Sequence, residues 1–91
     1  MKKTIWIARV ADDNSDAYTA CYDQPSARAA AGNYFDHLTP GERRTHTVSV
    51  ESYSVEAPDG DDRSAETLVR DLLAEDSEDL LNPDTWEEIT K

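Results

Sequence analysis

Carboxylates are the most distinctive chemical groups in the last third of this 91-residue chain. Between residues 71 and 90 there are eight acidic residues and no Lys or Arg: Asp71, Glu75, Asp76, Glu78, Asp79, Asp84, Glu87 and Glu88. On a helix, acids four residues apart repel one another by roughly 0.2–0.5 kcal/mol per pair, so local stability does not explain the set. Neighbouring side chains on a helix face lie about 5–6 Å apart, comparable to the spacing of phosphates along a nucleic-acid strand. We therefore expect these eight residues to bind a basic partner surface.

Other residue types that carry chemistry do not form a recognisable constellation. Cys21 has only His37 and His46 as candidate bases, and no predicted element places either beside the thiol. Two His residues without clustered Cys are too few for a structural zinc site. The three glycines are scattered, so no phosphate-binding loop can be assembled. We expect no enzymatic activity and no cofactor or metal.

Two acidic loops are weak candidates for cation binding. In residues 12–16, Asp12, Asn14 and Asp16 alternate as in a calcium loop, but Ala17 stands where the sharp turn requires Gly. Residues 57–63 form the second acidic loop. We expect residues 12–16 to form a solvated hairpin turn and neither loop to hold a specific metal.

The charge balance limits the possible partners. Lys and Arg number 9 and Asp and Glu number 20, giving a net charge of −11. A chain this acidic is repelled by bare nucleic acid and by anionic membranes. No apolar run approaches the ~18 residues needed to span a bilayer, and the single cysteine cannot form an intrachain disulfide. These features favour a cytoplasmic protein that binds neither nucleic acid nor membrane directly.

The apolar pattern predicts a small core in residues 1–56. Residues 4–10 and 17–22 alternate as two strands of a hairpin. Pro25 suits the first turn of a helix, and a helical stripe follows it at Ala27, Ala31, Tyr34, Phe35 and Leu38. Residues 45–55 predict a third strand whose apolar phase changes near residues 51 and 52. We expect a β-bulge there, which would return both halves to one core face.

Residues 57–63 predict a loop, and residues 64–91 an acidic helical segment packed on the same single domain. Ser64 is a suitable cap for an amphipathic helix with apolar residues at Ala65, Leu68, Val69, Leu72 and Leu73. After Pro83, residues 84–89 predict a last short helix anchored by Trp86 and Ile89. The expected fold is α+β, with a three-stranded, mostly antiparallel sheet (β-β-α-β), helices on one face and two acidic helices at the end.

In size and in the acidity of residues 71–88, the chain resembles a loose group of small phage and mobile-element proteins. The group includes nucleic-acid-mimicking anti-restriction and anti-CRISPR inhibitors. The resemblance implies a non-enzymatic inhibitor that occludes the basic groove of a nucleic-acid-binding nuclease or effector.

Two alternatives remain open. The first is a small structural or regulatory protein that forms a homodimer, in which acidity serves solubility and an open sheet edge pairs with its copy. Its important residues would be apolar: Tyr53, Val55, Leu72, Leu73, Leu80, Leu81 and Trp86. The second is a metal-dependent hydrolase, which requires a convergent carboxylate cluster in a cleft.

Overall fold

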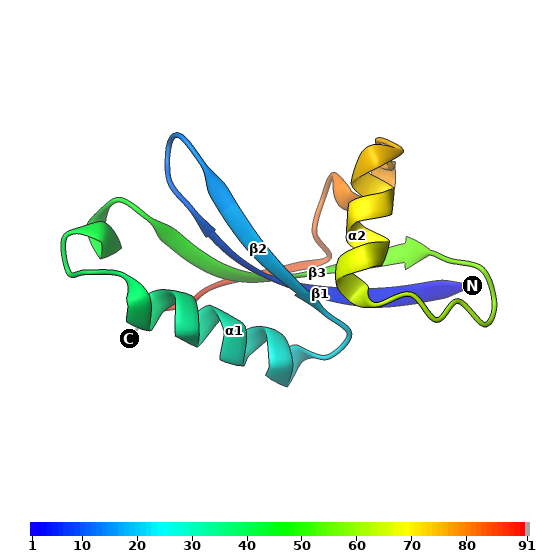
Figure 1. The fold of residues 1–91 in the computed structure, drawn as a ribbon, viewed down its shortest axis with the longest axis horizontal. Helices are drawn as coiled ribbons and strands as arrows, with labels where there is room; N and C mark the ends of the chain where they lie inside the picture. The colour runs from blue at the N-terminus through cyan, green and yellow to red at the C-terminus, as the bar shows by residue number, and fades with distance from the viewer. Residues whose placement is uncertain (91) are drawn as a thin grey trace.

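The structure, a computed structural model, describes residues 1–90, which form four antiparallel strands and two α-helices (Figure 1). The elements follow in the order β1 (Lys2–Ala11), β2 (Asp16–Cys21), α1 (Gln24–His37), a 3₁₀ helix η1 (Glu42–Arg44), β3 (Thr47–Glu56), α2 (Ala65–Ala74), a second 3₁₀ helix η2 (Glu78–Leu80) and β4 (Thr85–Glu88). The strand order in the sheet is β2-β1-β3-β4. The predicted α+β class and antiparallel sheet are confirmed, but the sheet has four strands rather than three.

The pairing of β1 with β3 forms the centre of the sheet. Lys2 lies opposite Glu56 and Ala11 opposite Thr47, and the register between these pairs is continuous. The β-bulge predicted near residues 51 and 52 is therefore wrong. No bulge is needed, because each half of β3 packs against a different helix.

The two helices cover opposite faces of the sheet, not one face as predicted (Figure 1). Alternate residues of a strand point to opposite faces, so one strand can contribute to two cores. Tyr53 and Val55 belong to the core under α2, together with Ile5, Ile7, Leu68, Val69 and Leu72. Val48 and Val50 belong to the core over α1, together with Ala8, Ala27 and Ala31. The change of apolar phase in β3 thus marks the change from one core to the other.

Both predicted helix starts are confirmed by their caps. At the start of α1 the Asp23 carboxylate accepts a hydrogen bond of 2.8 Å from the Ser26 N–H, and a proline occupies the first turn. At the start of α2 the Ser64 hydroxyl accepts a bond of 3.2 Å from the Thr67 N–H. These caps satisfy N–H groups that have no partner within the helix.

Residues 84–89 do not form the predicted helix. Instead, the short strand β4 pairs with the outer edge of β3, and the Asp84 and Ile89 N–H groups donate to β3 carbonyls at 2.7 and 2.8 Å. Pairing there satisfies β3 backbone groups that solvent would otherwise have to satisfy, and Thr, Trp and Ile suit a strand. The expectation of two acidic helices is therefore wrong, because α2 is followed by a single 3₁₀ turn and a strand.

Candidate functional site

The eight carboxylates of residues 71–88 are divided among α2, η2 and β4. Two of them form ion pairs with cations from elsewhere in the chain. Asp71 lies 3.0 Å from Arg63 Nη1, and Glu87 lies 2.7 Å from Arg28 Nη2 on α1. Neither pair has a helical i,i+4 spacing. Local sequence does not reveal these neutralised charges.

The carboxylates of β4 do not lie on one face. Glu87 and Glu88 are consecutive strand residues, so their side chains point to opposite sides of the sheet. Asp84, just before the strand, accepts a hydrogen bond of 2.6 Å from the Ser54 hydroxyl. Asp84 and Glu87 therefore help hold β4 in place.

A compact acidic group remains where α2 ends and η2 begins. We call the group formed by Leu73, Glu75, Asp76, Glu78 and Leu81 the α2–η2 turn. Its three acids are exposed and form no ion pair within residues 1–90. Leu73 is 52% and Leu81 71% exposed, and both line a shallow depression of about 160 Å³ together with Asp76, Ser77 and Leu80. The turn thus combines uncompensated negative charge with exposed apolar surface. Asp79, beside it, is occupied by a hydrogen bond from the Glu56 N–H.

The backbone of the α2–η2 turn is well defined. The Asp76 N–H donates to the Leu73 carbonyl and the Ser77 N–H to the Leu72 carbonyl, which together form a Schellman helix end. Asp76 occupies the left-handed position with φ of 53°, where Gly is usual. The motif fixes the direction in which the chain leaves α2. It therefore also fixes where the backbone places the three acids relative to the helix.

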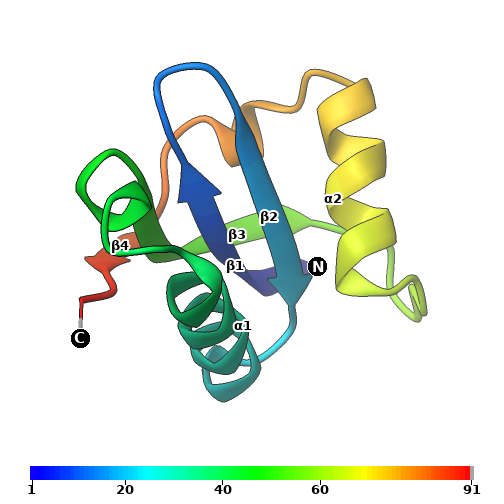
Figure 2. The same ribbon diagram turned by 60° about the vertical axis from the view of Figure 1, so that its left-hand side comes forward.

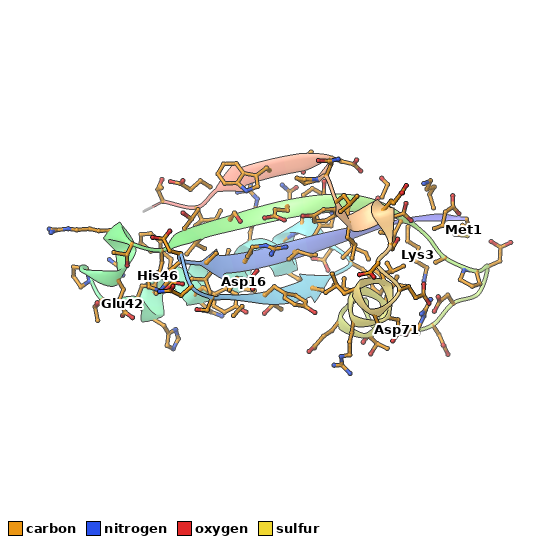
Figure 3. The ribbon with its side chains drawn as sticks, turned by 90° about the horizontal axis from the view of Figure 1, so that it is seen from above. Met1, Lys3, Asp16, Glu42, His46 and Asp71 are labelled. Carbon is orange, nitrogen blue, oxygen red and sulfur yellow. The ribbon has the colours of Figure 1, made fainter. Side chains whose placement is uncertain are left out.

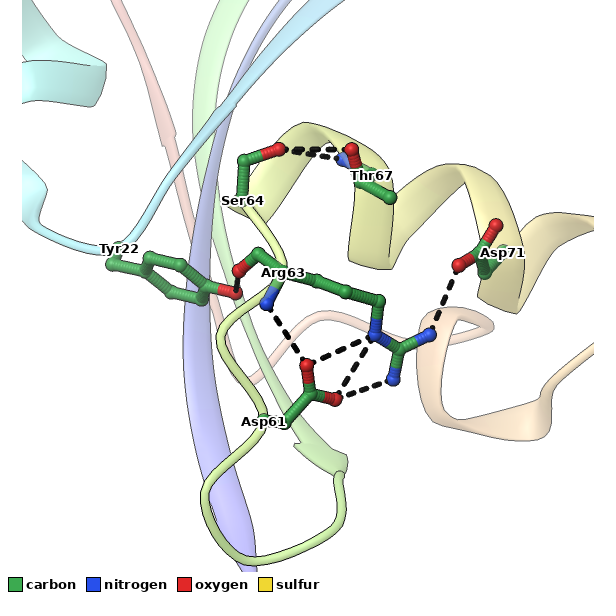
Figure 4. A network of polar contacts seen from close by, with 6 residues as sticks. All are labelled: Tyr22, Asp61, Arg63, Ser64, Thr67 and Asp71. Carbon is green, nitrogen blue, oxygen red and sulfur yellow. Dashed lines mark hydrogen bonds and ion pairs between the residues drawn. The ribbon is translucent and has the colours of Figure 1, made fainter.

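A network of polar contacts holds the start of α2 against the sheet (Figure 4). The Arg63 guanidinium contacts both Asp61 and Asp71. The backbone carbonyl of Arg63 accepts a hydrogen bond of 2.6 Å from the Tyr22 hydroxyl. The side-chain hydrogen bond from Arg63, followed by the bond from its backbone N–H, lowers the pKa of Asp61 to about 2. The loop 57–63 is therefore tied to Tyr22, which follows β2, and to α2, and it positions the helix that presents the α2–η2 turn.

A second polar cluster, not predicted from the sequence, lies on the α2 side of the sheet. Glu51 is only 6% exposed and accepts hydrogen bonds from the hydroxyls of Tyr53 and Ser49. Arg9 Nε lies 3.3 Å from Glu51 Oε1 without the alignment of a hydrogen bond, while Arg9 Nη1 donates to Asp16 at 2.7 Å. Burial, and secondly the bond to Glu51, raise the pKa of Tyr53 to about 12. The alternation of Ser49, Glu51 and Tyr53 on one strand face was the available sequence signal.

This Arg9–Glu51–Tyr53 cluster borders a partly enclosed depression, which Arg9 and Tyr53 help to line. The cavity, of about 290 Å³, is lined by mostly apolar side chains from the sheet, α2 and η2, together with the charged Arg9 and Asp16. The buried carboxylate already has a cation and two hydroxyl donors as partners. The contacts with Glu51 and Asp16 hold the Arg9 and Tyr53 side chains in place where they line the cavity.

The remaining candidates have structural roles. The Asp12 carboxylate accepts bonds from the N–H groups of Asn14 and Ser15, as in a hairpin turn. Burial raises the pKa of the Cys21 thiol, which disfavours the reactive thiolate. Within residues 1–90, no three His, Cys, Asp or Glu side chains are arranged to hold a metal ion.

Neither α1 nor α2 has the length and apolar character needed to cross a membrane, and residues 1–90 hold no other α-helix. Comparison with protein-family models, with curated proteins and with solved structures finds no significant match for this chain.

Proposed function

We propose that the protein is a non-enzymatic interaction module whose α2–η2 turn binds a basic, partly apolar surface of a partner protein. The observation that carries the proposal is the set of three carboxylates, Glu75, Asp76 and Glu78, exposed at the end of α2 with no cation paired to them in residues 1–90. Acids are disfavoured at a helix C-terminus, because the macrodipole already places negative charge there. The positions of Glu75 and Asp76 at the end of α2 therefore oppose local stability.

Basic residues elsewhere are largely committed to other carboxylates. Lys2, Arg9, Arg28, Arg63 and Arg70 each form an ion pair away from the α2–η2 turn. No cation of residues 1–90 lies within ion-pair distance of the three carboxylates of the turn. A cationic partner surface would be attracted to it over roughly one Debye length, about 10 Å at 0.1 M salt.

The exposed leucines make the surface more than a charged patch. Leu73 and Leu81 flank the acids and line the shallow depression between α2 and η2. Protein interfaces combine an apolar centre with a polar rim, and the rim charges chiefly set association rate and partner choice. A basic groove that normally holds nucleic acid, as on a nuclease or effector, would present suitable chemistry. Binding there would act by occlusion, with no covalent step.

The test is a pull-down with three forms of the full chain as bait: the wild type, the variant E75K/D76K, and the control D59K/D62K. The control reverses two other exposed carboxylates without an ion pair in residues 1–90, so both variants have the same net charge. We expect a partner that the wild type and the control retain at low salt, that high salt releases, and that the α2–η2 variant does not bind. Circular dichroism verifies that each bait is folded.

Retention of the same proteins by all three baits would refute the proposal, as would the absence of any specific partner. Light scattering addresses the self-association alternative. A dimer that persists at high salt and in the α2–η2 variant would favour that alternative instead.

A further inference from the structure

We propose that the free edge of β2 binds an extended segment of a partner protein as an additional antiparallel or parallel strand. This surface lies beside the α2–η2 turn and is independent of the function proposed for it. β2 pairs only with β1, and no other segment within residues 1–90 pairs with its outer side. Addition of a strand to an open sheet edge is an established mode of peptide recognition.

The hairpin geometry identifies the backbone groups that face outward. The Asp12 N–H donates to the Ser15 carbonyl, so pairs along the hairpin alternate between bonded and non-bonded from that point. Ala17, Thr19 and Cys21 are then bonded to β1, whereas the N–H and C=O groups of Tyr18 and Ala20 face away from it. These outward groups form the row to which another strand can bond.

The two edges of the sheet differ in protection. The edge strand β4 has only four residues and carries Glu87 and Glu88, features that discourage strand addition. Residues 17–21 of β2 contain no charge and no proline, and the register with β1 has no bulge. None of the side chains of β2 is fully buried. Residues 17–21 therefore lack the charge, proline and bulge that commonly keep another strand away from a sheet edge.

A depression lies on each side of β2, which runs between α1 and α2 (Figure 2). On the α2 side is the cavity of about 290 Å³, lined mostly by apolar side chains that include Tyr18, Val69 and Leu73, with Arg9 and Asp16 as its charged residues. On the α1 side is a groove of about 340 Å³, lined by Thr19, Asn33, Tyr34 and His37. Side chains of an added strand point alternately to the two sides. Apolar residues would enter the α2 side and small polar residues the α1 side.

Charge and shape define the occupant as a single extended segment with basic ends. Asp13 lies in the hairpin turn at one end of β2 and Asp23 follows the other end, and neither forms an ion pair in residues 1–90. Both α1 and α2 contact β2, and Figure 3 shows α2 beside the sheet near the labelled Asp71. A second copy would bring its own two helices and a net charge of −11 to the same edge. A lone segment with Lys or Arg at each end avoids both conflicts.

The test uses NMR of the ¹⁵N-labelled full chain with the acetylated, amidated peptide Lys-Leu-Thr-Leu-Thr-Leu-Lys as probe. We expect the amides of Tyr18 and Ala20 to shift most and to become protected from hydrogen exchange. Two matched peptides are N-methylated on all Leu or on all Thr backbone nitrogens. They distinguish backbone pairing with β2 from binding through side chains alone. One strand edge carries all the Leu N–H groups and the other carries the Thr N–H groups. Only one of the methylated peptides should lose binding, by about 10-fold or more.

Three results would overturn the proposal: no shift at β2, equal binding of both methylated peptides, or a concentration-dependent dimer in which Tyr18 and Ala20 are protected without peptide. Leu81→Ala changes a residue of the α2–η2 turn that does not line the cavity beside β2 and leaves the charge unchanged, so this variant should bind the peptide like the wild type, which distinguishes this edge from the turn. Ala20→Pro removes one outward N–H and should weaken peptide binding. The methylated peptides on the wild-type chain provide the decisive comparison even if that variant does not fold.

Discussion

Replacing Asp76 with Gly should make the protein more stable. Asp76 has φ of 53° at the left-handed position of the Schellman motif. That conformation costs an L-residue free energy. For Asp the cost is at the low end of the usual range, about 1 kcal/mol, because its short polar side chain tolerates the left-handed region. The greater freedom of Gly in the unfolded chain offsets about 0.5 kcal/mol. Removing a negative charge from the helix C-terminus adds about 0.5 kcal/mol to the free energy of unfolding.

The expected net gain of Asp76→Gly is therefore about 1 kcal/mol in the free energy of unfolding, or roughly 4–8 °C in Tm for a domain of this size. Asp76→Asn retains the tolerance for the left-handed region and removes the charge, so it should gain only about 0.5 kcal/mol. Urea and thermal denaturation followed by circular dichroism would measure both. The same two variants should weaken binding of the basic partner. A Gly variant less stable than the wild type would show that the Asp76 side chain stabilises the turn, and would refute this reasoning.

Three further predictions concern the core and the pH dependence. Leu68 is fully buried, so Leu68→Ala should lower the free energy of unfolding by about 2–5 kcal/mol, whereas Leu81→Ala at the exposed turn should change it by less than about 0.5 kcal/mol in the same denaturation assay. Because the pKa of Asp61 is lowered to about 2 from 3.8, its contribution to stability is present above about pH 4 and lost as pH falls toward 2, so Asp61→Asn should flatten stability measured across that interval. Because the pKa of Tyr53 is raised to about 12 from 10, its neutral form contributes stability below pH 10 that is lost as pH rises toward 12. Absorbance titration of the four tyrosines should show one ionising near pH 12, and Glu51→Gln should lower that pKa while burial keeps it above 10.

Local sequence signals were sufficient for most elements. The caps at Asp23 and Ser64, and the apolar spacing behind them, place both helices correctly. The alternation in β1, β2 and β3 likewise identifies these strands. The change of phase in β3 was also a correct observation, but its interpretation assumed a single core. Two cores on opposite faces explain the same pattern without a bulge.

The strand β4 could not be predicted from its own residues. Its formation depends on the unpaired outer edge of β3, which lies more than thirty residues away in pairs such as Glu51 and Trp86. The division of the acidic residues is non-local in the same way. Arg28 neutralises Glu87 from a separation of 59 residues, and no spacing rule connects them. Sequence reasoning could therefore find the excess of acids, but not which of them remain unpaired.

The central position of β1 has a consequence for biosynthesis. Its partner residues on β3 lie between 36 residues away, for Ala11 and Thr47, and 54 residues away, for Lys2 and Glu56. While the chain is being made, α1 can cover only one face of the β1–β2 hairpin, and the core that contains Ile5 and Ile7 cannot form until β3 and α2 have left the ribosome. Ile5 and Ile7 then remain accessible to chaperones throughout translation of the first half of the chain. Ribosome-arrested chains that end before residue 56 should accordingly remain protease-sensitive, because both cores contain side chains of β3 and neither is complete without them.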